Sequence, residues 1–268
     1  MVILHILILW ALVGVALGVA FFVEHRRRRK DSDEKPEYGV AQSFVASSYG
    51  LLLGLLVAFG ANHHSDVRAR AQDEADSMIA LWTTVNVYPP SARDRAQHAI
   101  FCYMRSIRDD DWPSMERGNP LESYRTGKFG DQLRLTISQL PEKGGQEASA
   151  YGRAQGIATE ATKSREQLLF FTEPRVPTVL WVVVYVGAFL LFLLIALHYA
   201  GRPTGRLVSL GAVVTLLTVV VTVLSMFDHP YGAGARVGPT AMQHAIELAN
   251  FQNKTTGVFG PCQLPAIV

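Results

Sequence analysis

Four stretches of the sequence run for more than 20 residues without Asp, Glu, Lys or Arg, and they constrain the fold more than any other feature. A helix needs about 20 apolar residues to cross a hydrocarbon core about 30 Å thick. Because backbone groups must be paired in lipid, a spanning segment is a helix or part of a closed barrel. The runs are continuous rather than alternating, which favours helices over Val2–Val23, Gly39–Ala61, Val176–Ala200 and Leu207–Phe227.

The remaining sequence predicts how these spans are organised in an all-α integral membrane protein. Residues 1–61 hold the first two spans and a basic loop, and residues 176–227 hold the last two spans. Residues 62–175 form a helical extramembrane domain, and residues 228–268 form a Pro/Gly turn, a short helix and a tail. We therefore expect four transmembrane helices with a helical domain inserted between the second and the third.

Apolar spacing and capping residues predict the helices of the inserted domain. Apolar residues recur at spacings of three and four from Val67 to Val85, so the second membrane helix is expected to continue outward as far as Pro89. Ser91 followed by Asp94 indicates a capping box at the start of the next helix. Two more helices are expected over 131–140 and 146–171.

Basic residues in the two short loops predict the orientation. Arg26–Lys30 and Lys35 follow the first span, and Arg202 and Arg206 separate the last two spans. Short loops rich in Lys and Arg stay in the cytoplasm, so residues 62–175 and the tail are expected outside it, in a bacterial inner membrane. The first run is interpreted as a retained helix, because the positive charge of a signal peptide precedes its apolar run. The basic cluster either sets the topology or also binds anionic membrane lipid.

Charge and motifs exclude several function classes. The net charge of +2 is too small to indicate nucleic-acid binding. The sequence lacks GxSxG, P-loop, HExxH and strand-following GxGxxG motifs, so we expect no enzyme activity and no cofactor. Cys102 and Cys262 both lie outside in the predicted topology, either as a disulfide or as two buried free thiols.

The second span carries a row of small and polar residues. Ser43, Ser47, Gly50 and Gly54 fall on one helical face. Such a row can line a water-accessible path through an oligomer. Gly50 and Gly54 can alternatively form a GxxxG pair for close helix packing. We favour packing, and both roles can coexist.

Polar residues follow the second and fourth spans at the same predicted membrane surface. His63, His64 and Asp66 follow the second span, and Asp228 and His229 follow the fourth. Imidazole and carboxylate groups can bind a transition metal or titrate near neutral pH. Neither HxxxH nor CxxC spacing supports a metal site, so solvated polar residues are the favoured interpretation and no metal is expected.

The fourth span ends in FDHPYGAGARVGP, a turn that contains Pro230 and Arg236. An Asp at a helix C-terminus is disfavoured by the helix dipole, so we expect Arg236 to pair with Asp228 and pin the tail. Arg236 can alternatively attract anions at a pore mouth or pair with the acidic run Asp109–Asp111. That run is interpreted as a solvated helix end rather than a cation site.

Several stretches together resemble the bacterial bestrophin-like membrane protein family. They are GLLLGLLVAFGANHHSDVRARAQDEADSMIALW, RDDDWPSMERG, REQLLFFTEPRVPTVLW and FDHPYGAGARVGP. The resemblance extends from the first helix to the tail helix around Leu248, and Tyr231 stands where phenylalanine is expected.

This resemblance implies a function as well as a fold. Bestrophins are pentameric anion channels whose second membrane helix lines the pore. They keep their helical domain in the cytoplasm, whereas the basic loops here predict the opposite side. The resemblance therefore implies a homo-oligomer, a pentamer if bestrophin-like, that conducts chloride or another small anion past the second span. The alternative is a non-conducting scaffold or sensory protein acting through its extramembrane helices.

Overall fold

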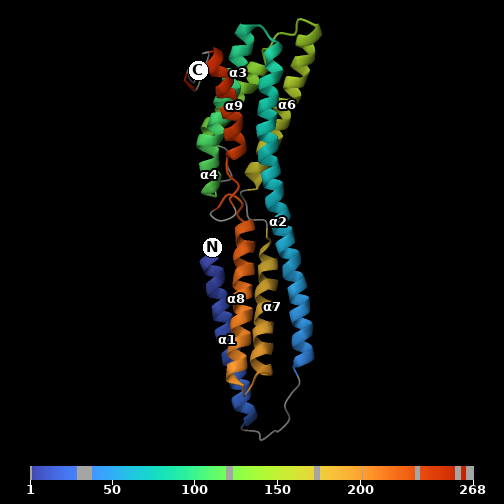
Figure 1. Cartoon of the computed structure of the whole chain (residues 1–268), viewed down its shortest axis with the longest axis vertical. Helices are drawn as coiled ribbons and strands as arrows, with labels where there is room; N and C mark the ends of the chain where they lie inside the picture. Colours follow the sequence, from blue (N-terminus) through green and yellow to red (C-terminus); the bar gives the residue numbers. More distant parts are fainter. Residues whose placement is uncertain are drawn as a thin grey trace. The chain divides into compact units, whose positions relative to one another are not determined.

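The computed structural model describes residues 2–28, 38–118, 123–171, 176–200, 202–232, 236–256 and 261–263. Every regular element in these ranges is helical, which confirms the all-α prediction (Figure 1). Four helices are long and apolar enough to cross a membrane: α1 (Val2–Arg28), α2 (Gly39–Thr84), α7 (Thr178–His198) and α8 (Pro203–Phe227). Their identity and order are those expected from the four apolar runs.

The chain divides into two compact units. Unit 1 comprises residues 1–63 and 174–228, and unit 2 comprises residues 64–173 and 229–268. We expected the boundaries after residues 61, 175 and 227. The helix α2 contributes its first part to unit 1 and its second part to unit 2, and its 46 residues are about twice what one membrane crossing needs.

Unit 1 is built on the packing of α1, α7 and α8 with the first part of α2 (Figure 1). The Tyr49 ring of α2 lies against Gly187 of α7, where an added Cβ atom would lie 2.5 Å from two ring carbons. The Tyr49 hydroxyl donates a hydrogen bond to the Val184 carbonyl at 2.7 Å. The absence of a side chain at Gly187 therefore provides the space for Tyr49.

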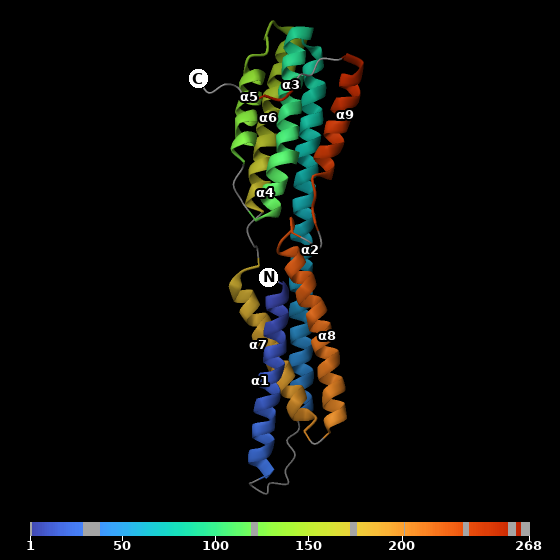
Figure 2. The same ribbon diagram turned by 90° about the vertical axis from the view of Figure 1, so that its left-hand side faces the viewer.

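Unit 2 is a bundle around the second part of α2 (Figure 2). The chain passes through η1 (Val85–Val87) into α3 (Pro90–Ser106), which continues through the π-helical turn η2 (Ile107–Asp111) into α4 (Trp112–Glu116). The bundle is completed by α5 (Tyr124–Ser138), α6 (Gly145–Phe170) and α9 (Thr240–Thr256). The face of α3 and η2 that carries Ala99, Cys102, Tyr103 and Ile107 is buried, as its spacing indicates.

Two predicted helix starts are wrong. Ser91 does not cap α3: the helix begins at Pro90, its N-cap is Pro89, and no side chain caps it. Proline is well suited to the first helical position because it lacks the N–H that would be unpaired there. Helix α5 begins at Tyr124 rather than Asp131, because the Ser123 hydroxyl accepts a hydrogen bond from the Thr126 N–H at 3.2 Å.

The Gly187→Ala substitution is expected to destabilise unit 1, because the new Cβ atom overlaps the Tyr49 ring. Overpacking of this kind costs about 1–3 kcal/mol. Thermal unfolding of the detergent-solubilised protein measures the effect. Gly14→Ala on α1 is the matched control, since its Cβ atom meets no described heavy atom within 4 Å. Equal stability of the two variants would contradict the packing of Tyr49 on Gly187.

Candidate functional site

The membrane part of α2 presents three different faces. Tyr49, Leu53, Leu56 and Gly60 form the face buried inside unit 1. The large exposed side chains Phe44, Leu51, Leu55 and Phe59 form a second face, which suits lipid. At 100° per residue the row Ser43, Ser47, Gly50 and Gly54 is centred about 120° from the buried face.

The Ser/Gly row does not pack inside the chain. Ser43, Ser47, Gly50 and Gly54 are all exposed, and Cβ atoms added at the two glycines would meet no described heavy atom within 4 Å. The favoured packing interpretation therefore has no partner helix within the described part of the chain. The row extends over about 17 Å of helix, at 1.5 Å per residue. Exposed hydroxyl groups and bare backbone are poor lipid contacts, so this face suits water or a helix of another chain.

The ion pair predicted between Asp228 at the end of α8 and Arg236 does not form. Arg236 pairs with Glu116 of α4, not with Asp228. The Asp228 carboxylate instead accepts a hydrogen bond from the Val176 N–H at 2.9 Å, two residues before α7 begins. The partial positive charge at the start of α7 offsets the unfavourable position of Asp228 at the end of α8.

The turn itself is closed by backbone hydrogen bonds. The Val237 N–H donates to the Pro230 carbonyl at 2.8 Å, and the Gly232 N–H donates to the His229 carbonyl at 3.0 Å. His63, His64 and His229 are half-buried and Asp66 is exposed. None of these four residues belongs to a group of three metal-ligating side chains among the described residues.

Unit 1 contains a polar cluster that was not predicted from the sequence. His5 of α1 stacks on Trp181 of α7 with ring centroids 4.2 Å apart, and its Nδ1 atom makes a hydrogen bond with the Tyr185 hydroxyl. Polar side chains within membrane helices usually face the bundle interior. A histidine inside the first apolar run was the available signal.

Unit 2 contains a buried charge cluster that was also not predicted from the sequence. Arg165 of α6 is 2% exposed and lies between Glu74 of α2 and Asp111 of η2. Its Nη2 atom donates to Asp111 Oδ2 at 2.5 Å, and its Nη1 atom lies 3.5 Å from Glu74 Oε2. Asp111 Oδ1 also accepts the Ser123 N–H at 2.9 Å. Asp111 is thus fully buried and forms an ion pair with Arg165. The prediction that Asp111 lies at a solvated helix end was wrong.

The electrostatics keep Arg165 charged. Burial by itself lowers the pKa of Arg165, but the carboxylates of Glu74 and Asp111 outweigh burial and raise it. Tyr231 lies beside this cluster; burial raises the pKa of its hydroxyl, which donates to the Leu168 carbonyl at 2.8 Å. Two carboxyl groups around one guanidinium hold α2, α6 and η2 together.

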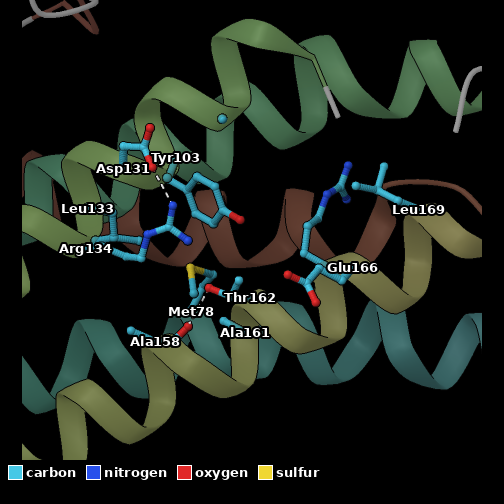
Figure 3. A pocket seen from close by; sticks show the side chains of 13 residues that line it. Met78, Tyr103, Asp131, Leu133, Arg134, Ala158, Ala161, Thr162, Glu166 and Leu169 are labelled. Carbon is cyan, nitrogen blue, oxygen red and sulfur yellow. Dashed lines mark hydrogen bonds and ion pairs between the residues drawn. The ribbon is translucent and has the colours of Figure 1, made fainter. Parts of the chain in front are cut away.

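Arg165 also lines a cavity of about 340 Å³ between α3, α5 and α6. Tyr103, Arg134 and Glu166 line the same space, together with Met78 of α2 (Figure 3). Arg134 is paired with Asp131. Acidic and basic groups both line the cavity, so it has no single charge preference.

A disulfide joins Cys102 of α3 to Cys262 of the tail, with Cα atoms 5.4 Å apart. Of the two arrangements considered from the sequence, the structure has the bonded one. The disulfide ties the segment that follows α9 to the core of unit 2 across a sequence separation of 160 residues.

The fold and the four spans define a helical membrane protein with a large extramembrane helical unit. A family model described as the bestrophin-like domain matches residues 6–242, so the chain belongs to the bestrophin-like family. A structure of a bacterial bestrophin homologue from Klebsiella pneumoniae superimposes with a TM-score of 0.67 at 14% identity, covering 97% of this chain and 100% of that one.

A second structure, described as a membrane protein, gives a TM-score of 0.67 at 13% identity, again covering 97% of this chain and 100% of that chain. At these identities the likeness establishes the fold alone. No curated protein matches the sequence.

Replacing Arg165 with methionine is expected to destabilise unit 2 by about 3–5 kcal/mol, because it leaves two buried carboxyl groups without their cation. Chemical denaturation followed by circular dichroism measures the change. Arg134→Met is the matched control: its pair with Asp131 is more than half exposed, and such pairs contribute about 0–1 kcal/mol. Similar losses in the two variants would contradict the structural role of Arg165.

Proposed function

We propose that the protein is a homo-oligomeric anion channel in which α2 lines the conducting path. One observation carries this proposal: the Ser/Gly row of α2 is exposed on a membrane helix, has no large apolar side chains, and packs against no other helix in the described part of the chain. A ring of copies can turn these rows toward a shared axis. Serine hydroxyl groups there can donate hydrogen bonds to a partly dehydrated anion such as chloride.

Family membership supports a channel over a monomeric carrier. Bestrophins form pentamers, so we propose five copies around the path. We further propose that the protein catalyses no reaction and uses no cofactor. Membrane lipid then contacts the large apolar face of α2, which is separate from the Ser/Gly row.

Two observations support a location in the inner membrane and an orientation that places unit 2 outside the cytoplasm. Arg206 of α8 lies 3.8 Å from Glu24 of α1, so the last turns of α1, which hold Arg26, and the first turn of α8 lie at one end of unit 1. Residues 29–37, which hold most of the basic cluster, lie outside the described residues. The Cys102–Cys262 disulfide is typical of an oxidising compartment.

A non-conducting scaffold or sensory protein is the second candidate. The observation that favours it is the cavity of about 340 Å³ in unit 2, which offers a place for a small ligand. Ligand binding there can act on α2 through Met78. A protein of this kind has no conductance.

Purified protein in planar bilayers is expected to carry a chloride-selective current, and Ser47→Leu is expected to reduce it about tenfold or more by adding an apolar constriction. A tenfold loss corresponds to a barrier of about 1.4 kcal/mol. Leu55→Ala on the large apolar face is the matched control and keeps the current. Native mass spectrometry of the same preparation is expected to give five subunits. If the wild-type protein carries no current at any voltage or pH, the scaffold function is favoured.

Fusions at the C-terminus test the orientation. An alkaline phosphatase fusion after Val268 is expected to be active, and a green fluorescent protein fusion at the same place is expected to be dark, because the first folds only outside the cytoplasm and the second fluoresces only inside. The reverse pattern places unit 2 in the cytoplasm. The same two fusions made after Pro36, in the basic loop, are the control. There the alkaline phosphatase is expected to be inactive and the green fluorescent protein to fluoresce.

A further inference from the structure

Three side chains that bind borderline-soft metal ions meet in unit 2. His98 and Cys102 lie four residues apart on one face of α3, and Cys262 joins them from the tail. Their ligand atoms all lie within 4.8 Å of one another. Thiolate and imidazole together are the ligand set of many zinc sites, including open sites with three protein ligands.

The distances match a tetrahedral zinc site. With Zn–S bonds of about 2.3 Å and Zn–N bonds of about 2.05 Å, a nitrogen and a sulfur ligand lie about 3.6 Å apart. His98 Nε2 and Cys102 Sγ are 3.6 Å apart. The Cα atoms of Cys102 and Cys262 are 5.4 Å apart, so both sulfur atoms can reach one ion with the backbone in place.

A cavity gives access to this cluster. It has a volume of about 170 Å³, and His98, Arg95 and Gln132 are among the residues that line it. The Oε1 atom of Gln132 is buried and has no hydrogen-bond partner in the described part of the chain. Of the three candidate ligands His98 lines this cavity, so an ion in the cavity can reach its imidazole.

We propose that His98, Cys102 and Cys262 form a redox-gated Zn²⁺ site. The disulfide keeps the site closed, because neither sulfur is then a thiolate. A dithiol reductant opens it: two thiols of the reductant become a disulfide, and their electrons and protons convert the Cys102–Cys262 bond to two thiols. Binding of Zn²⁺ releases both thiol protons and leaves two thiolates and one neutral imidazole as ligands.

Co²⁺ is the probe for the first test, because a thiolate-to-cobalt charge-transfer band reports sulfur ligation directly. The untagged full chain is reduced with a water-soluble phosphine, which becomes the phosphine oxide with oxygen from water, and excess reagent is removed. The reduced protein is expected to bind one Co²⁺ per chain with this band and to release it to Zn²⁺. The oxidised protein shows no band. Absence of the band in reduced protein overturns the proposal.

Matched variants separate the site from the other histidines. His98→Gln is expected to weaken metal binding by at least about tenfold, and the double variant Cys102→Ser, Cys262→Ser is expected to abolish the band. His244→Gln, an exposed histidine of α9, is expected to bind as the wild type does. Equal affinity of His98→Gln and His244→Gln shows that His98 is not a ligand.

Thermal unfolding provides a readout independent of spectroscopy. Zn²⁺ is expected to raise the melting temperature of the reduced protein and leave that of the oxidised protein unchanged, because only the reduced native state binds the ion. Loss of the helical circular dichroism signal on reduction, before metal is added, also overturns the proposal, since the site needs α3 and the tail in their native positions. No step of this test depends on conductance.

Discussion

Arg165 and its two carboxyl partners are the interaction on which unit 2 depends. A guanidinium at 2% exposure is stable only if nearby groups replace its water, and Glu74 and Asp111 do so from two other elements. These partners are 91 and 54 residues earlier in the sequence. The ion pairs therefore specify which faces of α2, α6 and η2 meet, whereas small apolar residues such as Ala158 and Ala161 allow several arrangements of similar energy.

The same element, α2, connects this cluster to the membrane. In unit 2 it contributes Glu74 and Met78 to the core. In unit 1 it contributes Tyr49, whose ring packs against Gly187. Each anchor fixes the rotation of the helix within its own unit. In unit 1 that rotation leaves the Ser/Gly row exposed and separates it from the lipid-suited face. The proposed conducting surface is thus a consequence of where Tyr49 packs.

The helices with a long, continuous apolar run were predicted from the sequence. The helix start that depends on a single capping residue was not. Each of the four spans contains an apolar run of more than 20 residues, so boundary errors of a few residues did not hide them. The start of α5 was missed because Gly127 and Gly130 lower helix propensity there. Capping by Ser123 and burial of Phe129 compensate in the folded chain.

The buried charges were missed for a different reason. Glu74, Asp111 and Arg165 occupy the same three-and-four spacing as the apolar residues of their helices, as in Ala71, Glu74 and Met78. Charged residues of opposite sign within the apolar faces of separate helices were the available signal. A single sequence shows that each lies on the apolar face of its own helix, but their pairing depends on distances between helices.

The FDHPYG turn shows how adjacent residues can serve two units without pairing with each other. Asp228 receives the N–H of Val176 at the start of α7, in unit 1. Three residues later, Tyr231 donates to Leu168 near the end of α6, in unit 2. Asp228 and Tyr231 thus each make their hydrogen bond within their own unit. Arg236 is then available to bind Glu116 and fix the start of the tail, which explains why a polar turn rich in Pro and Gly follows so apolar a helix.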